Sequence, residues 1–184
     1  MMQRVVDATT VVIDNVNDAQ LTNPTLCTEW MVKDLINHMV GGSTMFAISA
    51  EEGSVPDEML GQLMGGDNVG DDPKGAWAQS SKRAMAAFGL PGAMEKIVKL
   101  PFGEMPASIA LNIAIFDVAT HAVDLARATG QHVSDTEMLE GALAMGQQMI
   151  GPELRMPGVF GAEQSISETA SAEDRLLAFA GREI

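Results

Sequence analysis

Basic residues are scarce in this chain of 184 residues. It has 11 lysines and arginines against 25 aspartates and glutamates, which gives a formal net charge of −14 at pH 7. A protein that binds nucleic acid neutralises phosphates with a face rich in lysine and arginine, and these few basic residues are spread along the whole chain. The sequence therefore argues against a nucleic-acid partner and predicts a well-solvated acidic surface.

Cysteine is scarcer still, because Cys27 is the only one. A single cysteine excludes an internal disulfide and a cluster of thiolates around a structural metal, and it fits a reducing compartment. The N-terminal stretch lacks the layout of a signal peptide, and its aspartates interrupt it well short of a membrane span. A glycine-rich phosphate loop and a serine-hydrolase motif are also missing. We therefore expect a soluble, cytoplasmic protein without a membrane partner.

What the sequence does contain is the balance of an ordinary globular protein, with 46% hydrophobic and 20% charged residues. The length fits one domain over residues 1–184, with a short C-terminal extension from about residue 152. Apolar spacing, glycines and prolines predict helices at about 3–20, 29–50, 57–64, 73–88, 106–130, 134–151 and 172–181. A small extended segment is expected near 97–102. The predicted fold is all-α, an up-and-down four-helix bundle with short accessory helices.

Several helix starts are marked by capping residues. Asp72 precedes Pro73, which is a favourable first helical residue. Thr28 is expected to cap the helix at 29–50, and Ser171 the last helix. The run from Ser134 to Glu137 has the pattern of a capping box.

Polar residues interrupt the helix predicted at 106–130, which is otherwise apolar nearly all round. Asp117, His121 and Asp124 lie in its middle, although an unpaired carboxylate is costly to bury. Asp117 and His121 are four residues apart and so share one face. His38 lies on the apolar stripe of the helix at 29–50. Two imidazoles and a carboxylate from two facing helices would form a three-ligand metal site with open positions.

Each member of this trio also has an ordinary interpretation. A histidine on an apolar stripe can be a hydrogen-bonded core residue, and Asp117 and His121 can bond to each other within their helix. The pairing of His38 with the helix at 106–130 is an assumption about packing. Residue spacing alone leaves both interpretations open.

Other polar residues near these motifs are expected to have structural roles. Asp124 is predicted to pair with Arg127, and His132 to be exposed to solvent. Cys27 is expected to pack at the start of its helix, apart from the metal site. For Asp34, one turn before His38, orientation of that ring and simple exposure are equally open.

Three segments resemble a known family. The stretches "PTLCTEWMVKDLINHMVGG" and "FDVATHAVDLARATG" are similar to the two signatures of the DinB-like, mycothiol-dependent maleylpyruvate isomerase N-terminal domain family. The closing "AEDRLLAFAGRE" resembles its short actinobacterial branch, whose members are described as metal-binding proteins. The resemblance implies a four-helix bundle that binds one divalent metal, zinc first and nickel second, through His38, Asp117 and His121.

The resemblance also implies a chemistry. Characterised relatives use mycothiol or a similar thiol, so a small-molecule thiol and an electrophilic substrate are the expected partners, and a homodimer is compatible with the family type. Thiol transfer or hydrolysis is the implied activity. The alternative is a non-enzymatic metal-binding or interaction bundle in which the trio is structural. The isomerase has a glutamate-type ligand in place of Asp117 and a separate C-terminal domain, and these departures argue against isomerase activity itself.

Overall fold

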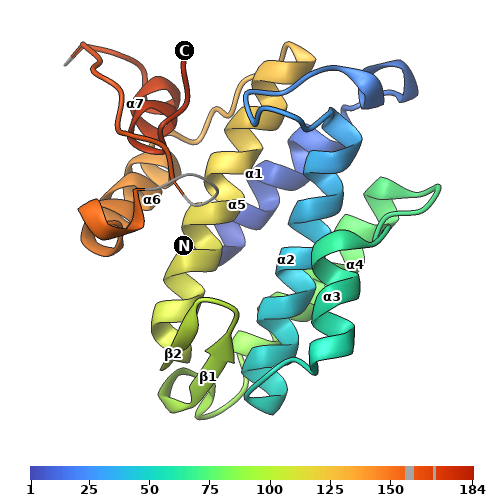
Figure 1. Ribbon diagram of the computed structural model, residues 1–184. Helices are drawn as coiled ribbons and strands as arrows, with labels where there is room; N and C mark the ends of the chain where they lie inside the picture. The colour runs from blue at the N-terminus through green and yellow to red at the C-terminus, as the bar shows by residue number, and fades with distance from the viewer. Residues whose placement is uncertain (156–159, 168) are drawn as a thin grey trace. The chain divides into compact units, whose positions relative to one another are not determined.

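The computed structural model describes residues 1–155, 160–167 and 169–184 (Figure 1). These residues are mostly helical with one small sheet, as predicted, and the chain divides into two compact units. The first unit contains Met1 and residues 3–32 and 115–184, and the second is formed mainly by residues 33–114. The prediction of a single domain stays a prediction, and each unit is described by itself.

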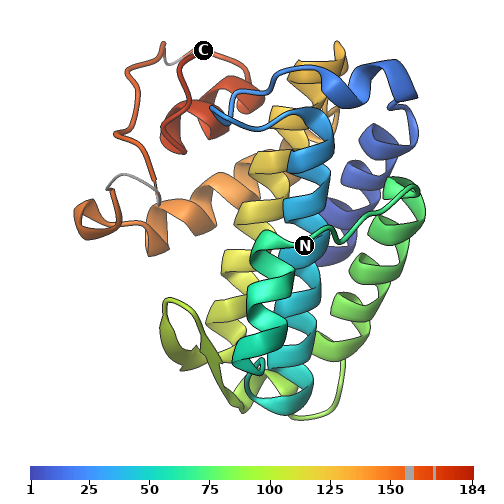
Figure 2. The same cartoon turned by 45° about the vertical axis from the view of Figure 1, so that its right-hand side comes forward.

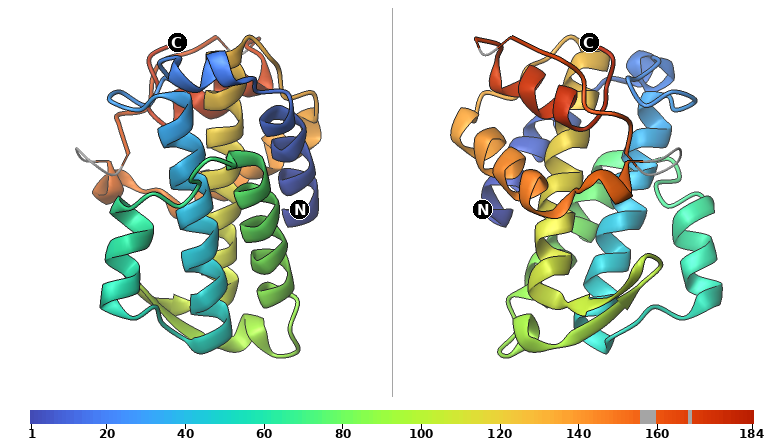
Figure 3. Two further views of the ribbon diagram at one scale, coloured as in Figure 1. Left: turned by 90° about the vertical axis from the view of Figure 1, so that its right-hand side faces the viewer. Right: turned by 60° about the vertical axis from the view of Figure 1, so that its left-hand side comes forward.

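The first unit is formed by the two ends of the chain. Its elements are α1 (Met2–Asp14), η1 (Asp18–Thr22), the Ile115–Thr129 part of α5 (Ala107–Thr129), α6 (Thr136–Met149), η3 (Pro152–Leu154) and α7 (Ala172–Phe179). The helices α6 and α7 lie side by side (Figure 3). The first helix ends at Asp14 and a 3-10 turn follows, so the helix predicted at 3–20 is too long.

Side-chain caps fix where α6 and α7 begin. The Asp135 carboxylate accepts a hydrogen bond from the backbone N–H of Met138 at 3.0 Å, so the cap lies one residue later than the predicted capping box. Ser171 accepts from the backbone N–H of Asp174 at 3.1 Å, which confirms the predicted cap of the last helix. Both caps satisfy backbone donors that have no partner inside the helix.

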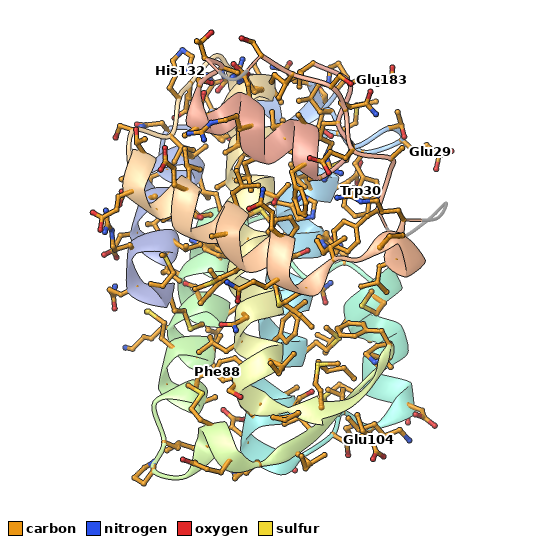
Figure 4. The ribbon with its side chains drawn as sticks, turned by 90° about the vertical axis from the view of Figure 1, so that its left-hand side faces the viewer. Glu29, Trp30, Phe88, Glu104, His132 and Glu183 are labelled. Carbon is orange, nitrogen blue, oxygen red and sulfur yellow. The ribbon has the colours of Figure 1, made fainter. Side chains whose placement is uncertain are left out.

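The segment before α2 (Val32–Glu52) corrects the predicted helix start at residue 29. Glu29 has a φ of 81°, which no right-handed helix contains, and the chain turns back on itself here. The backbone N–H of Thr25 donates to the carbonyl of Trp30 at 3.1 Å, and that of Val32 to Asn23 at 2.9 Å. These bonds tie the loop closed and delay the helix to Val32, so Thr28 is not its cap. Figure 4 labels Glu29 and Trp30 in this loop.

The second unit contains the middle of the chain. Its elements are most of α2, α3 (Asp57–Gly65), α4 (Pro73–Phe88), η2 (Ala93–Glu95), β1 (Ile97–Leu100), β2 (Gly103–Pro106) and the first two turns of α5. The helices α3 and α4 lie on different sides of α2 (Figures 2 and 3). Asp72 caps α4 by accepting from the N–H of Gly75 at 2.9 Å, as predicted. The antiparallel hairpin β1–β2 confirms an extended segment and continues it to residue 106.

The core of the second unit contains both small and large apolar side chains. Its buried members are Met45, Phe46, Ala47, Ala50, Ala84, Ala87, Phe88, Val98, Leu100, Ala107, Ala110 and Ala114. Figure 4 labels Phe88, the last residue of α4. Gly41 permits a close approach of α3 to α2, because a Cβ there would lie 2.3 Å from the carbonyl oxygen of Leu63.

The helix α5 is long and apolar enough to cross a membrane by length and composition. However, 72% of its most apolar 18-residue window is buried inside the protein. This pattern is typical of the central helix of a soluble protein, whose apolar faces pack against other elements.

Two glycines of α6 give opposite expectations for stability. A Cβ on Gly146 would lie 2.4 Å from Cε2 of Phe116 and 2.9 Å from Cε1 of Phe179, two rings in edge-to-face contact at 5.9 Å. Gly146→Ala should therefore destabilise the protein by about 1–3 kcal/mol, despite the better helix propensity of alanine. A Cβ on Gly141 meets the flexible end of Met1, so Gly141→Ala should stabilise it by up to about 1 kcal/mol.

Urea unfolding of the two variants measures this difference. Equal changes in the free energy of unfolding would mean that the aromatic pair yields to an extra methyl group, and the expectation for Gly146 would be wrong.

Candidate metal centre

The site is built on one face of α5. Asp117, His121 and Asp124 follow one another at spacings of four and three residues, which brings their side chains together. The Nε2 atom of His121 lies 3.4 Å from Oδ1 of Asp117, and its Nδ1 atom lies 3.0 Å from Oδ2 of Asp124. The imidazole is therefore held between two carboxylates, one at each ring nitrogen.

Asp124 is fully buried, and its charge is compensated by three side chains. Arg182, beyond the end of α7, donates from Nη2 to Oδ2 at 2.9 Å and from Nε to Oδ1 at 3.1 Å. Cys27 donates from Sγ to Oδ2 at 3.2 Å, and His121 supplies the third contact. Charge-assisted bonds of this kind offset the cost of taking a carboxylate out of water.

The charges around the imidazole shift the titration of both groups. Burial lowers the pKa of His121, but the negative charge and hydrogen bond of Asp117, together with hydrogen bonds to Asp124 and Cys27, outweigh it and hold this pKa well above its usual range. Burial raises the pKa of Asp124, but the hydrogen bonds and charges of His121 and Arg182 outweigh it and lower this pKa to about 2. Without a metal the ring therefore favours a second proton, at the nitrogen that faces Asp117.

Two sequence expectations about this region are wrong. Cys27 does not lie apart from His121, because its Sγ is 3.8 Å from Nδ1 of that ring. The loop that precedes α2 brings the thiol there, although the two residues are 94 positions apart. Asp124 does not pair with Arg127, whose guanidinium instead reaches Glu173 and Asp174 at 3.2 and 2.6 Å.

Other residues frame the site or lie away from it. The ring of Trp30 packs beside the His121 ring, with centroids 6.1 Å apart. His132 has a side chain that is 78% exposed, as predicted, with Nδ1 3.2 Å from Glu173 (Figure 4). Asp34 is exposed on α2.

The predicted metal ligands come from both units of the chain. Asp117 and His121 belong to the first unit, where they lie together on α5. His38 is half-buried on α2 and belongs to the second unit. Its place beside the other two ligands therefore stays a prediction, as does the metal site as a whole.

Sequence reasoning missed Arg182 and the cluster of Cys27, His121 and Asp124. Each of these three offers a ligand atom within 4.8 Å of the others, and all three belong to the first unit. The i, i+3 spacing of His121 and Asp124 could have indicated their contact. Nothing local indicates the contacts of Cys27 and Arg182, which depend on how distant segments pack.

Comparison with known proteins places the chain in a family. The sequence model of the mycothiol maleylpyruvate isomerase N-terminal domain family matches residues 3–126. This range includes His38, Asp117, His121 and Asp124. Two uncharacterized proteins from different strains of Mycobacterium tuberculosis are each 35% identical to this chain. The alignment of each covers 99% of this chain and 96% of the relative.

Solved structures show the same fold. The crystal structures of the mycothiol-dependent maleylpyruvate isomerase and of a histidine-to-alanine mutant align with a TM-score of 0.62, at 20% and 19% identity. The alignments cover 78% of this chain and 64% of the isomerase, so this chain matches less than two thirds of that protein's length. The likeness confirms the predicted DinB-like fold. With the match over residues 3–126, it follows that this chain belongs to the mycothiol maleylpyruvate isomerase N-terminal domain family.

Proposed function

We propose that this chain is a cytoplasmic enzyme that binds one divalent metal, zinc first and nickel second, through His38, Asp117 and His121. The metal serves in the transfer of a mycothiol-type thiol onto a small electrophile, or in hydrolysis. The observation that carries the proposal is the geometry of the His121 ring, which has one nitrogen held by Asp124 and the other facing the Asp117 carboxylate.

The donor set on α5 fits a metal. Two ligands of a tetrahedral zinc, one imidazole nitrogen and one carboxylate oxygen, lie about 3.3 Å apart when each bond is about 2.0–2.1 Å. The Nε2 and Oδ1 atoms of His121 and Asp117 are separated by 3.4 Å, close to this value. A metal between them would take the place of a proton at Nε2, so its binding should release a proton.

The remaining nitrogen of the ring has the support that metal-bound histidines usually have. A ligating histidine commonly donates its other N–H to a carboxylate, and Asp124 offers one at 3.0 Å. When bound, the metal supplies a Lewis acid that lowers the pKa of a coordinated thiol or water. The protein's own part is to hold Asp117 and His121 as ligands and to keep a proton at Nδ1 of His121.

Maleylpyruvate isomerisation is not part of this proposal. The relative that carries that name is matched over 64% of its length, and Asp117 is one methylene shorter than the glutamate-type ligand that the family resemblance implies. A shorter ligand arm changes where a metal can be held, so metal preference and substrate can both differ from those of the isomerase.

A second candidate function is a non-enzymatic binding or interaction protein. The favouring observation is that both nitrogens of His121 already face a carboxylate, which is a satisfied network without any metal. In that case the polar residues of α5 would stabilise the fold, and a partner would bind elsewhere.

Metal analysis of His38→Ala tests the proposed function, because His38 is the ligand contributed by the other unit. Plasma mass spectrometry on untagged wild-type protein should find about one equivalent of zinc or nickel, as expected for a three-ligand site with open positions. His38→Ala should lose most of it. The matched control is His132→Ala, which removes an exposed histidine and should retain the metal.

A metal-free wild type that stays empty after incubation with zinc and nickel would contradict the proposal and favour the second candidate. Metal retained by His38→Ala would remove His38 from the ligand set. A metal-loaded protein that accelerates no reaction between a thiol and any electrophile of a broad panel would contradict the catalytic part alone.

A further inference from the structure

We propose that Asp124 is a positioning residue for His121, and that Arg182 orients Asp124, so that the segment after α7 forms part of the metal centre. This inference rests on the proposed metal site. It extends that site to a residue 58 positions beyond Asp124, close to the end of the chain.

The role of Asp124 follows from its chemistry. An ionised carboxylate has acceptors and no donor, so the contact of 3.0 Å between its Oδ2 and Nδ1 of His121 requires a proton on Nδ1. When the ring is neutral, that proton leaves the lone pair on Nε2, the nitrogen that faces Asp117. Only this tautomer of His121 can offer Nε2 to a metal, and Asp124 selects it.

Arg182 fixes the direction in which the carboxylate points. Its Nη2 and Nε atoms reach the two oxygens of Asp124 at 2.9 and 3.1 Å, and a planar guanidinium binds a carboxylate in this forked manner. Oδ2, the oxygen that faces Nδ1 of His121, is also the oxygen that accepts from Nη2 of Arg182. Arg182 therefore holds this oxygen in place beside the imidazole.

The backbone holds Arg182 in this position. After α7 the N–H of Arg182 donates to the carbonyl of Leu177 at 2.9 Å and that of Gly181 to Ala178 at 3.0 Å, which is the Schellman pattern of a helix end. Gly181 has a φ of +83°, and a Cβ there would lie 2.6 Å from Cα of Gly161. The turn that aims Arg182 at α5 is thus set by glycine and by close backbone packing.

A purely structural ion pair between Asp124 and Arg182 would not control the imidazole tautomer, and this difference is testable with Asp124→Ala. Removal of the acceptor at Nδ1 leaves Asp117 as an acceptor at Nε2, so the ring proton should move to that nitrogen. In Arg182→Met the carboxylate at position 124 remains but loses its forked partner, so it should hold the proton at Nδ1 less firmly.

The experiment is nitrogen-15 NMR of the imidazoles at a pH where His121 is neutral, together with zinc affinity by chelator competition. We expect the Nδ1–H tautomer in wild type, the Nε2–H tautomer in Asp124→Ala, and a mixture of the two in Arg182→Met. Zinc affinity should fall by about 10–100-fold in Asp124→Ala and by less in Arg182→Met. The matched control is Arg175→Met, whose arginine pairs with Glu140 and should change neither quantity.

Three results would overturn the proposal. They are an Nε2–H tautomer in wild type, an unchanged tautomer in Asp124→Ala, and a tautomer in Arg182→Met identical to that of wild type. Even if a variant fails to fold, the wild-type spectrum shows which nitrogen of His121 carries the proton and so tests the proposal. The tautomers are read without metal, so a protein that binds no zinc would contradict the proposed function while the positioning of His121 is still judged by NMR.

Discussion

His121→Ala should lower the affinity of the protein for zinc by more than about 100-fold, beyond the loss expected for removal of a residue that only supports a ligand. The variant loses the nitrogen that faces Asp117, and it also loses the link between that carboxylate and Asp124. The partly exposed Asp117 and the buried Asp124 then have no imidazole between them. Asp124 cannot become a ligand in place of the imidazole, because Arg182 and Cys27 already hold its carboxylate.

Chelator competition with added zinc measures this loss, and His132→Ala is again the matched control. The side chain of His132 is 78% exposed, so its removal should leave the zinc affinity unchanged. Near-stoichiometric zinc in purified His121→Ala would exclude His121 as a ligand. Equal losses in the two histidine variants would mean that the loss of zinc is not specific to the site on α5.

Local chemistry in the sequence predicts part of this site. The four-residue spacing of Asp117 and His121 fixes their contact within one helix, whatever packs around it. The start of α4 at Pro73 is local in the same sense, because its cap Asp72 adjoins the helix. Such features depend only on residues that are close together in the sequence, so they can be predicted from it.

Contacts between segments that are distant in the sequence could not be predicted from it. The helix start expected at residue 29 fails because Thr25 and Trp30 close a loop by backbone bonds that no propensity indicates. Pairing Asp124 with Arg127 is reasonable on helix spacing alone. It fails because Asp124 faces the interior of the first unit, while Arg127 reaches α7.

Several of the few arginines form contacts that the composition did not indicate. Arginines attach the C-terminal part of the first unit to α5 and α6 or to itself, through the contacts Arg127–Glu173, Arg127–Asp174, Arg175–Glu140, Arg182–Asp124 and Arg155–Phe179. The sequence predicted a short C-terminal extension from about residue 152. Residues 156–159 and 168 lie outside the described part of the chain, whereas the described residues around them are tied to α7 by hydrogen bonds such as Gln164 to Ala178.

Asp124→Ala should cost about 3–5 kcal/mol of unfolding free energy in the metal-free protein, the range for removal of one member of a buried ion pair. Arg182 would be left without its carboxylate, and His121 without the acceptor at Nδ1. Arg182→Met should also destabilise, since it leaves the fully buried Asp124 with weaker donors.

The double variant Asp124→Ala/Arg182→Met separates the two contributions. With both charges removed, no buried charge is left uncompensated, so the double variant should be less destabilised than the sum of the single changes, by about 0.5–3 kcal/mol. Urea unfolding of all four proteins in the presence of a chelator measures this coupling. Single changes that cost less than about 1 kcal/mol, as for an exposed pair, would contradict it. Such a small cost would mean that water reaches the Asp124 carboxylate. The ion pair with Arg182 would then not be what stabilises a carboxylate within the apolar helix α5.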